Sequence, residues 1–372
     1  MKLRLATERD SEALINFYAD SEFTTPIHLK LRKKGSFFFQ YNMQSDDFST
    51  YILEDPNEQN AIKAMISIVF RQGIIENELC TIGYVTDLRI SSERKVILEW
   101  AHSLLPVLRQ AKAERNCRYI FSVVAEAQQQ AMNAFIRPRN VRRELPRYYL
   151  YRRFHMVSLH GLWPWALPPL NSIITEKGTQ NDLEDLAKYI SLKTKERVPN
   201  YHPSTKEVLN SIEKWPGLNI EDFIIARDSK GHIVGCTALW CSIQHEEFIP
   251  IKYDSKSLTL KELLHLYSFI SSARRLSDVD IPLKFYYLSY LFADNSDIFY
   301  SLCFKSYQSV NKDHFLIYPH FEGSLMTQPA KSFISSRVKA GLYCLLDSEE
   351  KVPDFLKPRV LSPPPDFELA FI

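Results

Sequence analysis

The stretch from Cys80 to Phe135 constrains the fold of this 372-residue chain more than any other part. It opens with strand-forming residues, Cys80–Ile90, and continues into a helical pattern with a 3.6-residue period. The apolar positions of that helix are Val96, Ile97, Trp100, Ala101, Leu104, Leu105 and Leu108. A second apolar run (Cys117–Val124) and a second helix (Ala125–Ile136) are expected to follow. A strand–helix–strand–helix unit of this length predicts one half of an open α/β sheet.

The junction between the first strand and its helix is a candidate anion site. Ser92 is the expected N-cap, and Arg94 and Lys95 fall in the first turn. The free backbone amides at a helix N-terminus favour an anion such as phosphate, and cationic side chains beside them add to that preference.

The residues of this unit resemble the GNAT acetyltransferase superfamily. The segment Gln128-Gln-Gln-Ala131-Met-Asn-Ala134-Phe135 resembles the family's helix that begins Asn-x-x-Ala and ends Leu/Phe-Tyr. The family's other motif, Arg/Gln-x-x-Gly-x-Gly/Ala, wraps the coenzyme A pyrophosphate. It would fall on Arg94–Glu99, where this chain has no glycine. The resemblance therefore lies in the order, length and pattern of the elements, and it implies the fold more directly than the activity.

The second half of the chain repeats this order of elements. A strand at Asn171–Glu176 precedes helices at Asp182–Thr194 and Ser204–Lys214, and the hairpin IEDFIIARDSKGHIVGCTALWC resembles the second and third GNAT strands. Asn295-x-x-Ile298 resembles the Asn-x-x-Ala helix start, and SKSLTLKE stands where the glycine loop would be. We therefore expect an α/β (α+β) chain of two tandem, diverged GNAT-like domains. Each would hold its own mixed, mostly antiparallel twisted sheet, splayed and flanked by helices.

Composition and pattern suggest the domain boundaries. We expect an N-terminal domain over residues 1–160, a Pro- and Trp-rich connector over 161–171, a C-terminal domain over 172–322, and a tail over 323–372. The tail is expected to hold a strand at Val338–Leu346 and to lie along a domain surface. Two further helices are expected at Pro26–Gln40 and Thr259–Leu276. Pro106 is expected to kink or shorten the helix that contains it.

Composition also limits the kinds of site. Only 10 glycines occur, which argues against a glycine-rich loop that lets backbone approach a phosphate. The six cysteines form no CxxC pair, and the histidines form no HExxH motif, so we expect free thiols in a reducing compartment and no metal. The Arg-rich segment Arg137–Arg153 has three readings: a solvated loop, a site for phosphates or an acidic substrate, or a nucleic-acid patch. With a net charge of only +2, a nucleic-acid partner is not expected.

The expected location is the cytoplasm. No stretch approaches 18 uninterrupted apolar residues, and the N-terminal sequence MKLRLATERD lacks the apolar core of a signal peptide. A membrane partner is therefore not expected.

The GNAT resemblance implies a chemistry in which an amine attacks an acyl-CoA thioester directly. In the family, backbone amides at the end of the fourth strand hold the thioester carbonyl and the pantetheine. By position, the resemblance assigns this role to Leu88, Arg89 and Ile90. The expected co-substrate is acetyl-CoA. The other candidate cofactor-binding residues are Arg94, Lys95, Val96, Gln128 and Phe135. Tyr84 and Asp87 are the candidate catalytic acid and base.

Two hypotheses follow. The first is an N-acyltransferase with an active N-terminal half, acetylating a small-molecule or peptide amine. The second is a catalytically degenerate tandem GNAT-like protein that binds a ligand or partner. The absent glycines, and Phe135 where the family has tyrosine, favour the second; the element order and the basic Arg137–Arg153 segment favour the first. The sequence identifies neither the acceptor nor the oligomeric state.

Overall fold

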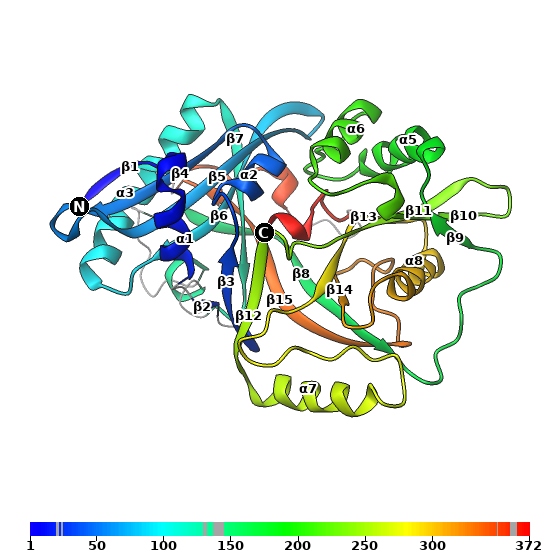
Figure 1. Cartoon of the computed structure of the whole chain (residues 1–372). Coiled ribbons are helices and arrows are strands. Elements are labelled where there is room, and N and C mark those ends of the chain that lie inside the picture. Colours follow the sequence, from blue (N-terminus) through cyan, green and yellow to red (C-terminus); the bar gives the residue numbers. More distant parts are fainter. Residues whose placement is uncertain (20–21, 24, 129–131, 137–144, 348, 358–362) are drawn as a thin grey trace.

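The computed structural model describes the chain except for residues 20–21, 24, 129–131, 137–144, 348 and 358–362 (Figure 1). The strands of the first half are β1 (Lys2–Leu5), β2 (Glu22–Phe23), β3 (Ile27–Lys33), β4 (Phe48–Asp55), β5 (Ala61–Ile75), β6 (Glu78–Ile90), β7 (Cys117–Ala125) and β8 (Arg147–Leu162). Its α-helices are α1 (Ser11–Ala19), α2 (Phe39–Gln44) and α3 (Arg94–Glu114).

The second half adds a similar set of elements. Its strands are β9 (Ile174–Lys177), β10 (Phe223–Arg227), β11 (Ile233–Trp240), β12 (Glu246–Tyr253), β13 (Phe285–Ala293), β14 (Phe315–Phe321) and β15 (Phe333–Leu346). Its α-helices are α5 (Leu183–Thr194), α6 (Thr205–Lys214), α7 (Ser255–Tyr267) and α8 (Ser296–Ser309).

Twelve strands form one continuous sheet, in the order β1-β4-β5-β6-β7-β15-β8-β14-β13-β11-β10-β9. Its neighbouring strands are antiparallel except for β6–β7 and β13–β14, which are parallel. The expected fold class, a mixed sheet flanked by helices, is confirmed. The expectation of two separate sheets is wrong, because β15 and β8 join the halves at the centre of a single sheet.

The two halves exchange their last strands. Strand β8 follows β7 in sequence but pairs with β14 of the second half, and β15 follows β14 but pairs with β7 of the first. The strand expected in the tail at Val338–Leu346 forms as part of β15, but it lies at the centre of the sheet and not on a domain surface. On either side of the central β15–β8 pair, the strands follow equivalent orders: β7-β6-β5-β4-β1 in the first half and β14-β13-β11-β10-β9 in the second. That agreement fits a tandem origin, which stays a prediction, as do the domain boundaries.

A second, three-stranded sheet also ties the halves together. Its order is β12-β3-β2, so β3 of the first half pairs with β12 of the second. The helix expected at Pro26–Gln40 is wrong: these residues form β3, with only the short α2 beginning at Phe39. The alternating residues of Ile27–Lys33 fit a strand with one face packed on the core.

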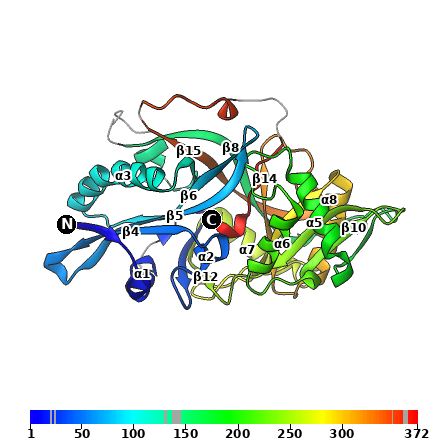
Figure 2. The same ribbon diagram turned by 90° about the horizontal axis from the view of Figure 1, so that it is seen from above.

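Helices cover both faces of the large sheet (Figure 2). On one face of the first half, α3 packs Val96, Trp100 and Leu104 onto the sheet. On the other face, α1 and α2 bury Leu14 and Tyr41. Pro106 does not shorten α3, which runs on to Glu114.

Two further helices differ from expectation. The helix expected at Ala125–Ile136 does not form over its first part, because β7 continues to Ala125; of its remainder, the described backbone at Met132–Ile136 forms a π-helical turn. Asn295 does cap a helix, but α8 follows β13 and leads into its parallel partner β14. Helix α8 therefore corresponds to α3 of the first half. The segment SKSLTLKE, expected at the start of that helix, instead begins α7.

Candidate functional site

The parallel strands β6 and β7 separate at a defined point. They pair from Thr81 and Cys117 up to Val85 and Ser122, and no pairing joins them beyond, although β6 runs on to Ile90 and β7 to Ala125. We call this opening the first splay and the Val85–Ser122 pair its vertex. An opening between parallel strands exposes main-chain groups that a ligand can contact.

The N-terminus of α3 follows the open end of β6. Glu93, rather than the expected Ser92, is the N-cap residue, and it forms a 2.9 Å ion pair with Lys63. Arg94 and Lys95 are exposed and make no hydrogen bond or ion pair with any residue that the structure describes. The side chain of Val96 is fully buried against the sheet, so any contact with an anion at this helix end would use its backbone amide.

Asp87 lies on β6 just beyond the vertex, at an irregularity in the pairing with β5. Its φ of 52° is in the left-handed region, which non-glycine residues rarely adopt. Its carboxylate accepts hydrogen bonds from the hydroxyls of Tyr18 and Tyr41 and forms a 3.0 Å ion pair with Lys33. The Lys33 ammonium also lies 4.5 to 5.1 Å from the ring centroids of Tyr18, Phe37 and Tyr41.

The charges around Asp87 favour its ionised form, which suits a structural ion pair better than general base catalysis. Burial by itself would raise the pKa of Asp87, but the charges of Lys33 and Arg89 and the two tyrosine hydrogen bonds lower it to about 2. A carboxylate this acidic is a weak proton acceptor at neutral pH. Its neighbour Arg89 lies over the ring of Phe23 at 4.0 Å, whereas Leu88 and Ile90 pack toward the core beneath α3.

Tyr84, the other predicted catalytic residue, lies beside the vertex. Tyr84 pairs with Phe121 in the register immediately before Val85 and Ser122. Burial raises the pKa of Tyr84, so its hydroxyl keeps its proton at neutral pH. Both Tyr84 and Phe121 line a pocket on the opposite sheet face from α3, since Val85, the next residue on β6, packs under that helix.

The C-terminal segment forms one wall of this pocket, which we call the tail pocket. Its lining residues are Arg71, Tyr84, Phe121, Pro199, Tyr201, Leu342, Pro365, Asp366, Phe367, Glu368 and Phe371. Phe371 stacks on Trp215 with ring centroids 4.7 Å apart, and the Gln40 amide donates to the carbonyl of Ala370. These contacts hold the segment at the centre of the molecule (Figure 1).

Two carboxylates reach the tail pocket. Glu368 accepts a 2.9 Å hydrogen bond from the backbone amide of Tyr290, and burial raises the pKa of Glu368 to about 7. Oδ2 of Asp366 lies 2.7 Å from Nδ1 of His202 and accepts a hydrogen bond from the amide of Tyr201. A carboxyl group with a pKa near neutrality is suited to general base catalysis.

The second half has a matching splay, already occupied by the chain itself. Strands β13 and β14 pair only up to Tyr287 and Ile317. Beyond that point, Tyr290 has a φ of 48°, at the irregularity that corresponds to Asp87. Because the amide of Tyr290 donates to Glu368, a backbone donor of the second splay is taken by the tail.

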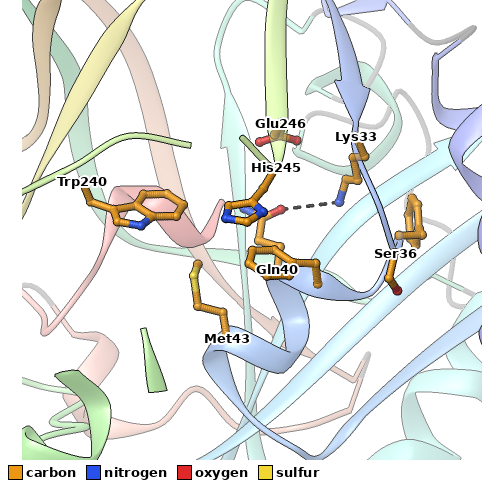
Figure 3. Close-up of a pocket in the computed structure, with 9 residues that line it drawn as sticks. Lys33, Ser36, Gln40, Met43, Trp240, His245 and Glu246 are labelled. Atoms are coloured by element: carbon orange, nitrogen blue, oxygen red, sulfur yellow. Dashed lines mark hydrogen bonds between the residues drawn. The ribbon is translucent and has the colours of Figure 1, made fainter. Parts of the chain in front are cut away.

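A second pocket lies where the halves meet, and we call it the junction pocket (Figure 3). Its lining residues are Lys33, Ser36, Phe37, Phe39, Gln40, Met43, Trp240, His245 and Glu246. Glu246, at the start of β12, pairs with Lys33 across the small sheet. Burial raises the pKa of Glu246 to about 7. Glu246 is therefore a second candidate base, supplied by the other half of the chain.

The structure also locates the remaining predicted residues. Gln128 belongs to a turn after β7, where its amide donates to the carbonyl of Ala125. The side chain of Phe135 lies outside the described part of the structure, as do Arg137, Arg139, Arg142 and Arg143. Of the basic segment, Arg147 is bound to the carbonyls of Asp347 and Glu350.

The sequence reasoning missed Glu368, Asp366 and Glu246. The signal was present for the first two, because two carboxylates in the apolar run PPPDFELAFI are costly to bury without a partner. Glu246 had no local signal, since its environment comes from β3, more than two hundred residues earlier.

Two kinds of feature are absent from the described residues. No group of three or more His, Cys, Asp or Glu residues could hold a metal ion there. Nor is any helix in that part of the chain long and apolar enough to cross a membrane.

Comparison with known proteins identifies relatives by fold alone. No family model matches the chain, and no curated protein matches it in sequence. It is similar to Saccharomyces cerevisiae N-myristoyltransferase with bound myristoyl-CoA and inhibitors, at a TM-score of 0.55 and 8% identity over 92% of this chain and 79% of that one. A second structure of that enzyme with bound myristoyl-CoA gives a TM-score of 0.51 and 10% identity over 92% and 82%. The chain therefore shares the fold of these N-myristoyltransferase structures.

Proposed function

We propose that this protein is an acyl-CoA-dependent N-acyltransferase whose thioester binds in the first splay. The observation that carries the proposal is the position of the vertex: it lies beside Tyr84 and next to a pocket that contains Glu368. Exposed Arg94 and Lys95 at the start of α3 are the proposed ligands of the coenzyme's phosphates. The second splay is not proposed as a donor site, because Glu368 occupies the amide of Tyr290.

The proposed reaction needs three proton transfers at the reacting groups. Glu368 takes a proton from the acceptor's ammonium group, and the neutral nitrogen attacks the thioester carbonyl carbon. The C–N bond forms, the C–S bond breaks, and the nitrogen loses a second proton to solvent. The coenzyme leaves as a thiolate and takes a proton from the Tyr84 hydroxyl, which solvent then restores. Leu88, Arg89 and Ile90 are proposed to contact the thioester and pantetheine through their backbone.

The length of the acyl group is a separate question. Acetyl-CoA is the donor that the sequence resemblance implies, whereas the yeast structures of similar fold carry myristoyl-CoA. We propose acetyl-CoA and would compare the two donors by calorimetric titration. Binding of either donor, weakened about tenfold in an Arg94→Ala/Lys95→Ala variant, supports the proposal. If neither donor binds at millimolar concentration, the acyltransferase proposal fails.

A binding protein without catalysis is the second candidate. Three features favour it: no glycine lies at the start of α3, Glu93 places a carboxylate at that helix end, and the Tyr84 hydroxyl is buried. This candidate predicts that the protein binds an amine ligand but transfers no acyl group from either donor. Mass spectrometry of reaction mixtures containing amines and acyl-CoA separates the two candidates.

A further inference from the structure

A chain of hydrogen bonds runs from the C-terminal segment to the hydroxyl of Tyr290, and we call it the tail relay. Oδ2 of Asp366 lies 2.7 Å from Nδ1 of His202. Nε2 of His202 lies 3.2 Å from the hydroxyl oxygen of Ser211, which lies 2.6 Å from the hydroxyl oxygen of Tyr290. Because a carboxylate can only accept hydrogen bonds, Nδ1 carries a proton and Nε2 is left to the Ser211 hydroxyl.

The tail relay closes on itself through Glu368. This residue follows Asp366 by two positions, and its carboxylate accepts a 2.9 Å hydrogen bond from the backbone amide of Tyr290. Tyr290 lies between Ser289 and Phe292, which pair with β11, at an irregularity of that pairing. A buried backbone amide needs a partner, and Glu368 supplies it here. The relay and this bond therefore join both carboxylates of the segment to one residue of β13.

The members of the tail relay are shielded from solvent. The side chains of His202 and Asp366 are only 8% and 2% exposed, Tyr290 is fully buried and Ser211 is half-buried. Burial by itself would raise the pKa of Asp366, but the charge and the hydrogen bond of His202 lower it. In a buried network of this kind, removal of one link leaves its neighbours unsatisfied. A change at Ser211 should therefore be felt at Glu368, which it does not contact.

The order aspartate, histidine, serine also occurs in hydrolases, where the serine hydroxyl attacks the substrate. In this protein the Ser211 hydroxyl meets the hydroxyl of the buried Tyr290, and Ser211 lines neither the tail pocket nor the junction pocket. The arrangement therefore favours a role in holding other groups over a role as a nucleophile.

Burial is the largest effect on Glu368, and it raises the pKa of this residue to about 7. The charge of Asp366 acts in the same direction, whereas the bond from the Tyr290 amide and the positive charges nearby oppose it. Because burial dominates, the pKa of Glu368 reports how closely the segment is held. The titratable and charged groups around Glu368 are Arg71, Tyr84, Arg197, Tyr201, His202 and Asp366.

We propose that His202 and Ser211 are positioning residues that hold the Glu368 carboxylate against the Tyr290 amide. They act through the Tyr290 hydroxyl at one end of the tail relay and through Asp366 at the other. The importance of this role rests on the proposed function, in which Glu368 is the base. The positioning itself is measured without any acyl donor.

The first test is hydrogen exchange of the Tyr290 amide in the full chain, resolved to single residues. Ser211→Ala and Tyr290→Phe each remove one hydroxyl and no charge, and each is expected to speed this exchange about tenfold, the usual effect of one lost hydrogen bond. The matched control is Ser306→Ala on α8, because the buried Ser306 hydroxyl has no hydrogen-bond partner among the described residues. Unchanged exchange in both relay variants, or acceleration spread evenly over the sheet, overturns the proposal.

The second test measures the ionisation of Glu368 directly. NMR of protein with 13C-labelled glutamate carboxyl groups, assigned with Glu368→Gln, should give a midpoint near pH 7 in the wild type. Ser211→Ala and Tyr290→Phe should lower this midpoint by roughly one pH unit, because a loosened segment lets water reach the carboxylate. Ser306→Ala should not move it. A midpoint that stays in place in both relay variants contradicts the positioning role, since a merely structural contact would not change it.

A third comparison shows whether the two residues act through one relay. If they do, the His202→Gln/Ser211→Ala variant should exchange the Tyr290 amide no faster than His202→Gln alone. Effects of the two substitutions that multiply would mean that they act independently, against the proposal.

Acyl transfer is measured separately in the same variants, with both donors. The relay variants should lower kcat and leave the KM for acyl-CoA unchanged, since they misplace the base and not the donor. A wild type that transfers no acyl group removes the proposed function, while the exchange and NMR results still decide the positioning role. Full activity in a variant whose Glu368 midpoint has moved keeps the positioning role and removes Glu368 as the base.

Discussion

Replacing Lys33 by methionine is expected to destabilise the protein by about 3–5 kcal/mol, the usual effect of removing one partner of a buried ion pair. The side chains of Lys33 and Asp87 are only 5% and 7% exposed, so solvent screens the pair very little. At their 3.0 Å separation, the Coulomb attraction is about 5 kcal/mol at an effective dielectric constant of ~20. Methionine keeps the contacts with the surrounding rings but leaves the Asp87 carboxylate with only hydrogen bonds and Arg89.

Urea unfolding followed by tryptophan fluorescence measures this loss. The matched control is Lys33→Met/Asp87→Asn, which removes both charges and should lie within about 2 kcal/mol of the wild type. The effect also has a pH signature. Because the pKa of Asp87 is lowered to about 2, its stabilising contribution is present above about pH 4 and is lost as pH falls toward 2. The difference between the wild type and Lys33→Met should therefore shrink over that interval.

Two results would refute this reasoning. A single substitution that costs less than about 1 kcal/mol would mean that the charge of Lys33 contributes little. A double variant as unstable as the sum of its single substitutions would mean that Lys33 and Asp87 do not interact energetically.

The remaining predictions concern the site. The rate of acyl transfer should rise with pH through about 7 and then level off, since Glu368 acts only when it is deprotonated. The Glu368→Gln variant should lose this rise in rate, whereas the Glu246→Gln variant should retain it. The opposite result for the two variants in a pH–rate profile would make Glu246 the base. Arg94→Ala/Lys95→Ala should weaken acyl-CoA about tenfold, with a flatter salt dependence by calorimetry than the wild type. Phe371→Ala should lower the free energy of unfolding by about 3–5 kcal/mol, because its buried ring stacks on Trp215; an unchanged urea midpoint would contradict that packing.

Sequence patterns predicted the first half best for elements whose contacts lie within a short stretch of the chain. The α3 helix was predictable because its apolar residues fall on one face, and its parallel neighbours β6 and β7 follow from the strand–helix–strand order. The segment Pro26–Gln40 was misread as a helix. Its strand conformation depends on pairing with β12, a contact that no local pattern records.

The site was predictable only in part, for the same reason. Tyr84 and Asp87 were selected by their position on β6, and the structure places both beside the vertex. The residues that give the pockets their chemistry, Glu368 and Glu246, come from the tail and from the second half. Their pKa values depend on burial by distant segments, which sequence spacing does not encode.

The exchange of β8 and β15 has a consequence for how the chain acquires its structure. While the polypeptide emerges from the ribosome, one edge of β7 and one edge of β8 have no partner until the entire second half has been made. Exposed strand edges of this kind can recruit other chains. The nascent protein should therefore depend on chaperones until β15 is inserted, and this last step completes the central sheet and brings the residues that follow β15 to the pocket.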